Sequence, residues 1–365
     1  MHTTIRNEFC LLPKSKIKAG EGIDNGNYPF FTSSDIKVSS LDSYEYDDEI
    51  VVIGTGGKPS CNYVNGKFSF STDNYALKAK GKIEPKFLYY FLRKDGLATL
   101  QNGFHGAGLQ HISKDYILNI EIPAFEKSKQ QTIVRVLDDI HGMILACQKQ
   151  LTLLDELVKS RFIEMFGGKD KNFLFSDCVN RMTKGPFGSA VKKDLYVSES
   201  EEAYKVYIQV NCIQKNELLG DYYISKDYFE SKMKTFEVKG GDYLITCDGT
   251  LGKYVRLSDN PRKGIISASL LRVQLQEDKI TPEYFESMWD FYLLDILKSQ
   301  VRNGCLVHLP SAKVIGSEKI FLPSMYDQKR FASFKRQVDK SKFVVQERIK
   351  LYQELLNKKM DEYFN

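Results

Sequence analysis

The feature of this sequence that most constrains its fold is an internal repeat with an offset of about 198 residues. The segment LLDELVKSRFIEMF, which begins at Leu153, is identical at five of fourteen positions to LYQELLNKKMDEYF, which begins at Leu351. Upstream, KIEPKFLYYFL at Lys82 matches KITPEYFESMW at Lys279. Because these matches follow the same order, we predict that the chain contains two copies of one structural unit.

The offset between the two copies changes along the chain. Gln130 corresponds to Gln328, 198 residues later, but Tyr28 in YPFF corresponds to Tyr204 in YKVY, only 176 residues later. This drift indicates extra residues in the second copy. We place this insertion around residues 189–203.

Each copy combines an α/β block with a long helix. The first block contains the short β-type runs EIVVIG and YALKAK, and the second contains DYLITC and SLLRVQL, all separated by glycine-rich turns. Each block also contains an amphipathic segment that opens with proline, at Pro85 and Pro282, where proline favours the first turn of a helix. The predicted fold class is therefore α+β.

The long helix of each copy carries an apolar stripe that repeats about every 3.5 residues, which indicates burial against another helix. The two long helices are the expected partners of each other, and a dimer through the same stripes is the alternative. Lys335, Lys342 and Lys359 interrupt the second stripe. The spacer positions are Ile133, Leu137, Ile140, Ile144, Leu151, Leu154 and Val158 in the first helix and Val338, Val345, Ile349, Tyr352 and Leu356 in the second.

Composition adds only weak constraints. The net charge of +5 arises almost entirely in residues 326–365, which contain 10 basic and 6 acidic side chains, so the bulk charge does not demand a nucleic-acid partner. No apolar run reaches the roughly 18 residues that span a membrane, so we expect a soluble, cytoplasmic protein. The seven cysteines show no C-x-x-C spacing, which favours buried free thiols over a zinc site or disulfides.

Three motifs carry a resemblance to a known family. They are YPFF from Tyr28, GDYLITCDGTLGK over residues 241–253, and IPAFEKSKQQTIVRVLDDI over residues 122–140, which leads into the first long helix. Each motif is loose by itself. Their combination, repeated along nearly the whole chain, resembles the specificity subunits of type I restriction–modification enzymes.

The resemblance implies two target-recognition domains, residues 1–125 and 168–325. They are separated by spacer helices, residues 126–167 and 326–365, which form an antiparallel coiled coil. In this family each domain reads one half of a bipartite double-stranded DNA target. The spacer docks two modification subunits, which carry S-adenosylmethionine, and restriction subunits, which use ATP and Mg²⁺, join that core. The chain itself would then be non-catalytic and hold no cofactor.

The residues themselves give little sign of catalysis. GTGGK ending at Lys58 and GTLGK ending at Lys253 lack the first Gly and the final Ser/Thr of a phosphate-binding loop, so we interpret them as turns between strands. The acidic-x-Lys pieces at residues 230–232 and 277–279 lack the upstream partner of a nuclease site. We find no spacing typical of a metal site.

Loops that combine glycine with Lys, Arg, Asn, Gln, Ser, Thr or His are the candidates for DNA contacts, since these side chains bind base edges and phosphates. The candidate residues for DNA contacts are Thr32, Ser33, Ser34, Lys58, Ser60, Asn62, Lys67, Asn102, His105 and Gln110 in the first block and Lys184, Gln209, Asn211, Thr250, Lys253, Arg302, Asn303 and His308 in the second.

The alternative function is a non-catalytic adaptor that binds only proteins through two blocks on a coiled coil.

Overall fold

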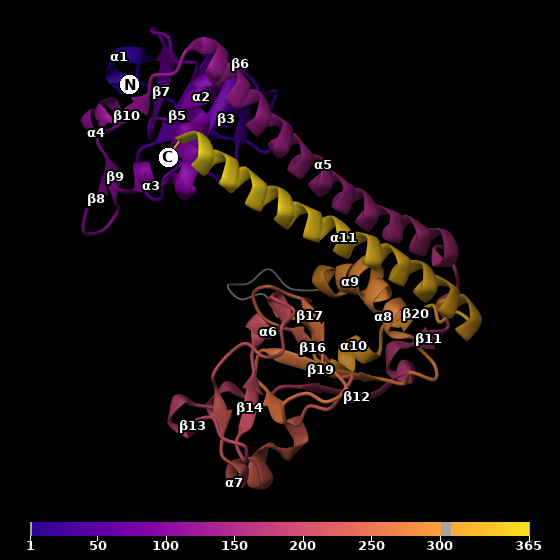
Figure 1. Ribbon diagram of the computed structural model, residues 1–365. Coiled ribbons are helices and arrows are strands. Elements are labelled where there is room, and N and C mark those ends of the chain that lie inside the picture. The colour runs from indigo at the N-terminus through magenta and orange to yellow at the C-terminus, as the bar shows by residue number, and fades with distance from the viewer. Residues whose placement is uncertain (1, 301–307, 365) are drawn as a thin grey trace. The chain divides into compact units, whose positions relative to one another are not determined.

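The computed structural model describes residues 2–300 and 308–364. The chain divides into two compact units: unit 1 comprises residues 1–151 and 343–365, and unit 2 comprises residues 152–342. Two long helices connect them (Figure 1): α5 (Lys127–Phe166) begins in unit 1 and ends in unit 2, and α11 (Met325–Phe364) begins in unit 2 and ends in unit 1.

The described part of unit 1 contains a six-stranded sheet in which β3 runs parallel to β6 and the other neighbours are antiparallel. Its strand order is β2 (Phe9–Leu11), β7 (Asn74–Ala79), β5 (Tyr46–Gly54), β6 (Cys61–Phe70), β3 (Tyr28–Phe31) and β4 (Ser39–Leu41).

The hydrophobic run of β5 reflects burial on both faces of this sheet. Val51 and Ile53 join a core that includes residues of α2 (Pro85–Arg93), whereas Ile50 and Val52 join a second cluster on the opposite face. Successive strand residues point to opposite faces, so a central strand covered on both sides must be apolar at every position.

Unit 2 repeats this topology in two sheets. As β3 does with β6, β14 runs parallel to β18, which confirms the predicted internal repeat. Within the described residues the first sheet has the order β12 (Val179–Lys184), β19 (Leu270–Leu275), β16 (Tyr243–Thr246) and β17 (Tyr254–Arg256). The second has the order β13 (Tyr196–Val197), β15 (Tyr223–Ile224), β14 (Tyr204–Tyr207) and β18 (Gly264–Ile266).

Short elements complete each unit. In unit 1 they are β1 (His2–Thr4), α1 (Ile5–Glu8), α3 (Ala98–Gln101), β8 (Phe104–His105), β9 (His111–Ile112), α4 (Lys114–Asn119) and β10 (Glu121–Pro123). In unit 2 they are β11 (Phe173–Leu174), α6 (Gln209–Ile213), α7 (Lys226–Tyr228), α8 (Pro282–Met288), α9 (Leu294–Ser299), α10 (Ala312–Gly316) and β20 (Lys319–Ile320).

The extra residues of unit 2 lie after Tyr204, so their predicted place at residues 189–203 was wrong. In unit 1 only residues 32–45 separate β3 from β5, whereas residues 208–242 separate the equivalent β14 and β16. The added segment forms α6, β15 and α7, and β15 pairs with both β13 and β14. The insertion therefore extends the second sheet of unit 2.

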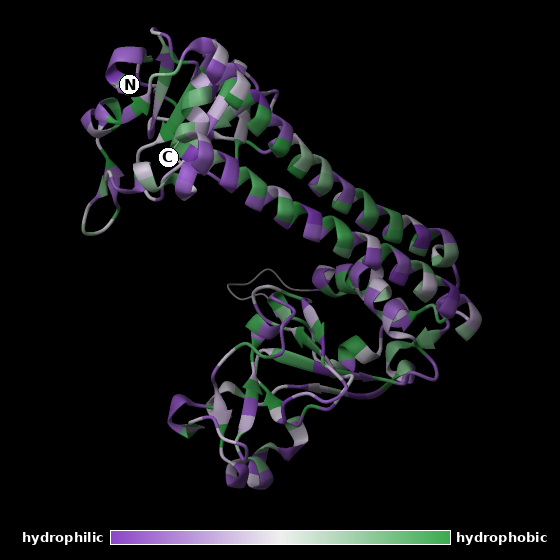
Figure 2. Ribbon diagram, in the orientation of Figure 1, coloured by the Kyte–Doolittle hydropathy of each residue, from purple (hydrophilic) through white to green (hydrophobic). Residues whose placement is uncertain are grey.

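The two long helices pack together in both units. In unit 1 Leu137, early in α5, shares a core with Met360, late in α11; in unit 2 Phe162, late in α5, shares a core with Phe331, early in α11. The helices are therefore antiparallel, which confirms the predicted fold class. Figure 2 shows hydrophobic and hydrophilic residues alternating along both helices.

Most predicted spacer positions of both helices are shielded from solvent. Ile133, Leu137, Ile140, Ile144, Val158, Val338 and Val345 are buried, and Leu151, Leu154, Ile349, Tyr352 and Leu356 are half-buried.

The lysines that interrupt the second stripe bind acidic side chains. Lys335 Nζ lies 2.7 Å from Glu286 of α8, Lys342 pairs with Asp155 of α5, and Lys359 lies 2.8 Å from Glu362. A lysine can bury its aliphatic stem along an apolar seam while its ammonium group reaches a carboxylate. These positions therefore continue the packing of α11.

A buried glutamine joins the start of each long helix to its block. Gln130 is fully buried: its Oε1 accepts a hydrogen bond from Glu84 N, just before α2 (2.9 Å), and its Nε2 donates to the carbonyl oxygens of Lys82 (3.1 Å) and Phe125 (2.8 Å). Without these hydrogen bonds the buried amide would destabilise the folded chain, since buried polar groups need partners.

Gln328 repeats this arrangement in unit 2. Its Oε1 accepts from Thr281 N (2.8 Å), and its Nε2 donates to the carbonyl oxygens of Lys279 (2.8 Å) and Pro323 (3.0 Å). Thr281 is the N-cap of α8. Each glutamine thus binds a long helix to the first turn of the block helix that it packs against.

Replacing Gln328 with alanine should lower the free energy of unfolding by about 2–4 kcal/mol, because one backbone N–H and two carbonyls lose their buried partner. Chemical denaturation would measure the loss. Gln337→Ala, an exposed position on the same helix, should change stability by less than about 0.5 kcal/mol. Equal effects of the two substitutions would contradict the role of Gln328.

The described cysteines are free, and five of the six are buried. Burial raises the pKa of the Cys61 and Cys247 thiols to about 12, so both are protonated near neutral pH. Cys10 is exposed, contrary to the expectation of buried thiols, because it lies on β2 at the edge of the sheet.

None of the described helices is long and apolar enough to cross a membrane. Over residues 2–300 and 308–364, no group of three or more His, Cys, Asp or Glu side chains is placed to hold a metal ion.

Candidate nucleic-acid interface

Three loops meet at one edge of the unit 1 sheet: residues 32–38 after β3, residues 55–60 between β5 and β6, and residues 106–110 between β8 and β9. Gly57 N donates to the Gln110 carbonyl (3.0 Å), which joins the second loop to the third. The strand ends thus bring together loops that are far apart in the sequence.

A surface hollow of about 760 Å³ lies at this edge. Exposed Lys58, Gln101 and Gln110 contribute a cation and two amides to it, the groups that bind phosphates and base edges. The lining residues are Ser33, Ser34, Asp35, Ile36, Gly56, Gly57, Lys58, Pro59, Gly96, Leu97, Gln101 and Gln110.

An ion pair holds the first loop in place. Arg93, at the end of α2, binds Asp35 through two nitrogens, at 2.6 Å and 3.0 Å, and also donates to the Cys61 carbonyl at 2.8 Å. Burial by itself would lower the pKa of the Arg93 guanidinium. The hydrogen bond to Asp35 is the largest of the interactions that oppose this effect, and together they raise the pKa above its ordinary value. The pairing offsets the only acidic charge among the lining residues, which would otherwise repel phosphate.

We expect Arg93→Ala to lower the free energy of unfolding by about 1–2 kcal/mol and to speed hydrogen exchange in residues 32–38, because a bidentate charged contact is lost. Arg6→Ala is the matched control: Arg6 and Asp115 form an exposed ion pair, worth under about 1 kcal/mol. Unchanged exchange in the loop of the Arg93 variant would show that the ion pair does not hold it.

Four of the predicted DNA contacts in unit 1 line this hollow: Ser33, Ser34, Lys58 and Gln110. Half-buried Thr32 directly precedes them, and exposed Asn102 and His105 lie outside the lining.

Three other predicted residues of unit 1 are placed differently. Ser60 is fully buried, with no hydrogen-bond partner for its hydroxyl. Asn62 uses its amide to bind the Ser34 carbonyl (3.2 Å). Lys67 pairs in register with Asp47, roughly 20 Å along the hairpin from the turn at residues 55–60.

The equivalent edge of unit 2 is built around His308. Its Nδ1 lies 2.6 Å from Asp248 Oδ1, and the two residues form a β-bridge in the same place as Gly56 and His111 of unit 1. Thr250 and Lys253 are exposed in the adjoining turn. Three predicted residues of this unit thus lie at one edge.

The other predicted residues of unit 2 differ in accessibility. Lys184 Nζ donates to the Leu309 carbonyl (3.0 Å), and Gln209 is half-buried at the start of α6. Asn211 is fully buried: it accepts from Ile208 N and donates to two backbone carbonyls, so its amide braces the inserted segment. Arg302 and Asn303 lie outside the described residues.

Sequence reasoning predicted His308 but missed three other residues that organise these edges: Asp35, Arg93 and Asp248. Asp35 and Arg93 are 58 positions apart, and Asp248 and His308 are 60 apart, so no local pattern marks either pair. Gln101 was missed although it directly precedes the predicted Asn102; the polar Gln-Asn-Gly sequence was the available signal.

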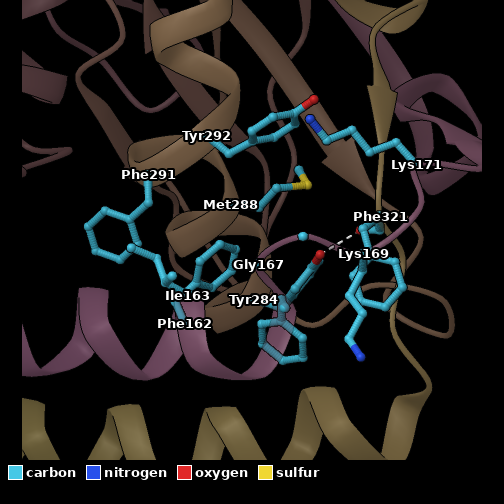
Figure 3. A pocket seen from close by; sticks show the side chains of 12 residues that line it. Phe162, Ile163, Gly167, Lys169, Lys171, Tyr284, Met288, Phe291, Tyr292 and Phe321 are labelled. Carbon is cyan, nitrogen blue, oxygen red and sulfur yellow. Dashed lines mark hydrogen bonds between the residues drawn. The ribbon is translucent and has the colours of Figure 1, made fainter.

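A smaller pocket of about 160 Å³ lies at the end of α5 in unit 2 (Figure 3). Phe162, Phe166 and Met288 give it an apolar lining. Its tyrosines Tyr284 and Tyr292 donate their hydroxyls to backbone carbonyls, at 2.5 Å and 3.0 Å. Lys169 and Lys171 also line this pocket.

Comparison with known proteins shows which proteins this chain resembles. Residues 8–154 match the family model of the type I restriction modification DNA specificity domain. The specificity subunit of the type I restriction enzyme EcoDI of Escherichia coli is 27% identical over 42% of this chain and 34% of that protein. A putative type I restriction enzyme specificity subunit of Haemophilus influenzae is 24% identical over 85% of this chain and 79% of that protein.

The chain is thus similar to type I specificity subunits. The match spans about a third of the length of the Escherichia coli relative.

Solved structures show that this chain shares its fold with proteins of type I restriction–modification systems. The type I restriction–modification S subunit of M. genitalium superposes with a TM-score of 0.57 at 14% identity, over 100% of this chain and 96% of that one. A structure described as the basis of complex assembly and conformational transition of the type I restriction–modification system gives a TM-score of 0.60 at 13% identity, over 100% and 97%.

Proposed function

We propose that this chain is a specificity subunit that reads a bipartite double-stranded DNA target, with one half-site bound by the loop edge of each unit. The observation that carries this proposal is the convergence of three loops of unit 1 on a hollow lined by Lys58, Gln101 and Gln110. The Asp248–His308 edge of unit 2 occupies the equivalent place of the repeat. Two similar readers fit a target with two specific halves.

The chain is proposed to act without chemistry of its own. In this proposal two modification subunits supply S-adenosylmethionine and restriction subunits supply ATP and Mg²⁺. The specificity subunit then contributes the choice of sequence and the separation of the two readers. A cytoplasmic location follows from this role, because the proposed target is chromosomal or invading DNA.

Exposed apolar residues on the long helices support docking of two identical partners. Leu153 and Leu157 of α5 are 53% and 47% exposed, and the residues 198 positions later, Leu351 and Leu355 of α11, are 63% and 39% exposed. Each pair is one helical turn apart, so its side chains share a face. A repeated apolar face is suited to two copies of one modification subunit.

The main experiment is to co-express the chain with a modification subunit and map methylated bases across a genome. A bipartite motif with an unspecific gap is expected. Exchanging residues 171–325 for those of a second specificity subunit should change one half-site and keep the other. A change in both halves would contradict separate readers. A stable complex whose DNA binding lacks both sequence preference and steep salt dependence would favour the protein adaptor.

The docking faces predict a change in stoichiometry. Leu157→Asp should reduce the complex from two modification subunits to one, because a charge is placed in one of two apolar contacts, and native mass spectrometry would count them. Lys159→Asp places the same carboxylate about 200° around the helix, with a larger change in net charge, and should keep both subunits. Retention of both subunits by the Leu157 variant would contradict docking at this face.

A further inference from the structure

Ile36 is fully exposed at the edge of unit 1, in the loop that follows β3. It is an apolar member of a hollow whose other lining residues include Lys58, Gln101 and Gln110. Single exposed apolar residues are common on protein surfaces, but the position of Ile36 beside groups suited to DNA raises the question of what it contacts.

The loop around Ile36 is braced, so the exposure is a property of a defined conformation. The Ser34 hydroxyl accepts hydrogen bonds from the backbone N–H groups of Ile36 (3.3 Å) and Lys37 (3.1 Å). Arg93 holds Asp35 on one side of Ile36, and Lys37 binds Asp24 (2.6 Å) on the other. Because isoleucine is branched at Cβ, its side chain is also stiff. A rigid apolar tip loses little entropy on contact with a partner.

The neighbours of Ile36 indicate the chemistry of that partner. Glutamine amides match N6 and N7 of adenine in the major groove, and an apolar side chain matches the 5-methyl group of thymine. Gln101 and Gln110 lie in the same hollow as Ile36, and Lys58 offers a charge to phosphate. An A·T pair presents both features side by side in one groove.

We propose that Ile36 is a specificity-determining residue that contacts the 5-methyl group of a thymine in the half-site read by unit 1. This inference rests on the proposed DNA-reading function and deepens it. Ile36 selects thymine by apolar contact alone, so uracil, which lacks only the methyl group, is discriminated against. The amides of the hollow read the adenine partner.

The test uses the full-length chain in complex with the modification subunit and a duplex that carries its mapped target. Each thymine of the unit 1 half-site is replaced in turn by deoxyuridine, and dissociation constants are measured. One replacement should weaken binding by about three- to ten-fold. The Ile36→Ala complex should bind the thymine duplex more weakly by a similar factor. Replacing that thymine with deoxyuridine should then leave its dissociation constant unchanged.

Matched variants keep the result interpretable. Val38→Ala, a half-exposed position of the same loop that does not line the hollow, should retain the uracil penalty. Ile36→Leu, which keeps an apolar tip, should retain part of it. Thermal unfolding of each complex shows whether a variant has lost its fold.

Three outcomes would overturn the inference. The first is an Ile36→Ala complex that still discriminates against uracil, and the second is a unit 1 half-site without a thymine. The third is an increase in 2-aminopurine fluorescence, which reports unstacking of the neighbouring bases, that is lost in the Ile36→Ala complex. The last outcome would assign it as a wedge between bases. A wild-type complex that does not prefer its mapped target over a scrambled duplex would instead refute the proposed function itself.

Discussion

The structure depends on the two buried glutamines at the starts of the long helices. Gln130 and Gln328 each satisfy a backbone N–H at the start of a block helix and two carbonyls of the adjoining loops. A buried amide with all its bonds made is specific in a way that apolar packing is not, because a rotated or shifted helix would leave those bonds open. The direction in which each long helix leaves its block is therefore set by hydrogen bonds.

Apolar packing at the other end of each helix complements this polar anchor. Phe166, in the last turn of α5, packs against Tyr284 of α8 with ring centroids 5.0 Å apart. Phe364, at its repeat position in α11, packs against Phe87 of α2 at 5.4 Å. Each block helix is thus bound by the start of one long helix and the end of the other. The repeated sequence at the helix ends exists because both units need the same closing contact.

The sequence predicted most of the architecture. The long helices, the central strands and the proline-started helices leave patterns among residues close together in the chain, and the repeat shows as matching segments in the same order. The antiparallel arrangement of the long helices was implied by the family resemblance. The candidate site was less predictable. Ser60 and Asn211 are of a residue type that binds DNA but are buried, and Lys67 lies at the opposite end of its hairpin from the hollow. The Arg93–Asp35 pair is created by the sheet, which joins residues 58 positions apart.

The closing contact made by Phe364 has a consequence for folding during synthesis. Unit 1 contains the earliest residues of this sequence, yet its core includes Met360 and Phe364 of α11. The apolar face of α2 cannot be fully covered until these residues have emerged from the ribosome. Until α11 has been synthesised, Phe87 and Phe91 therefore lack their contacts with Phe364, and the core of unit 1 is incomplete.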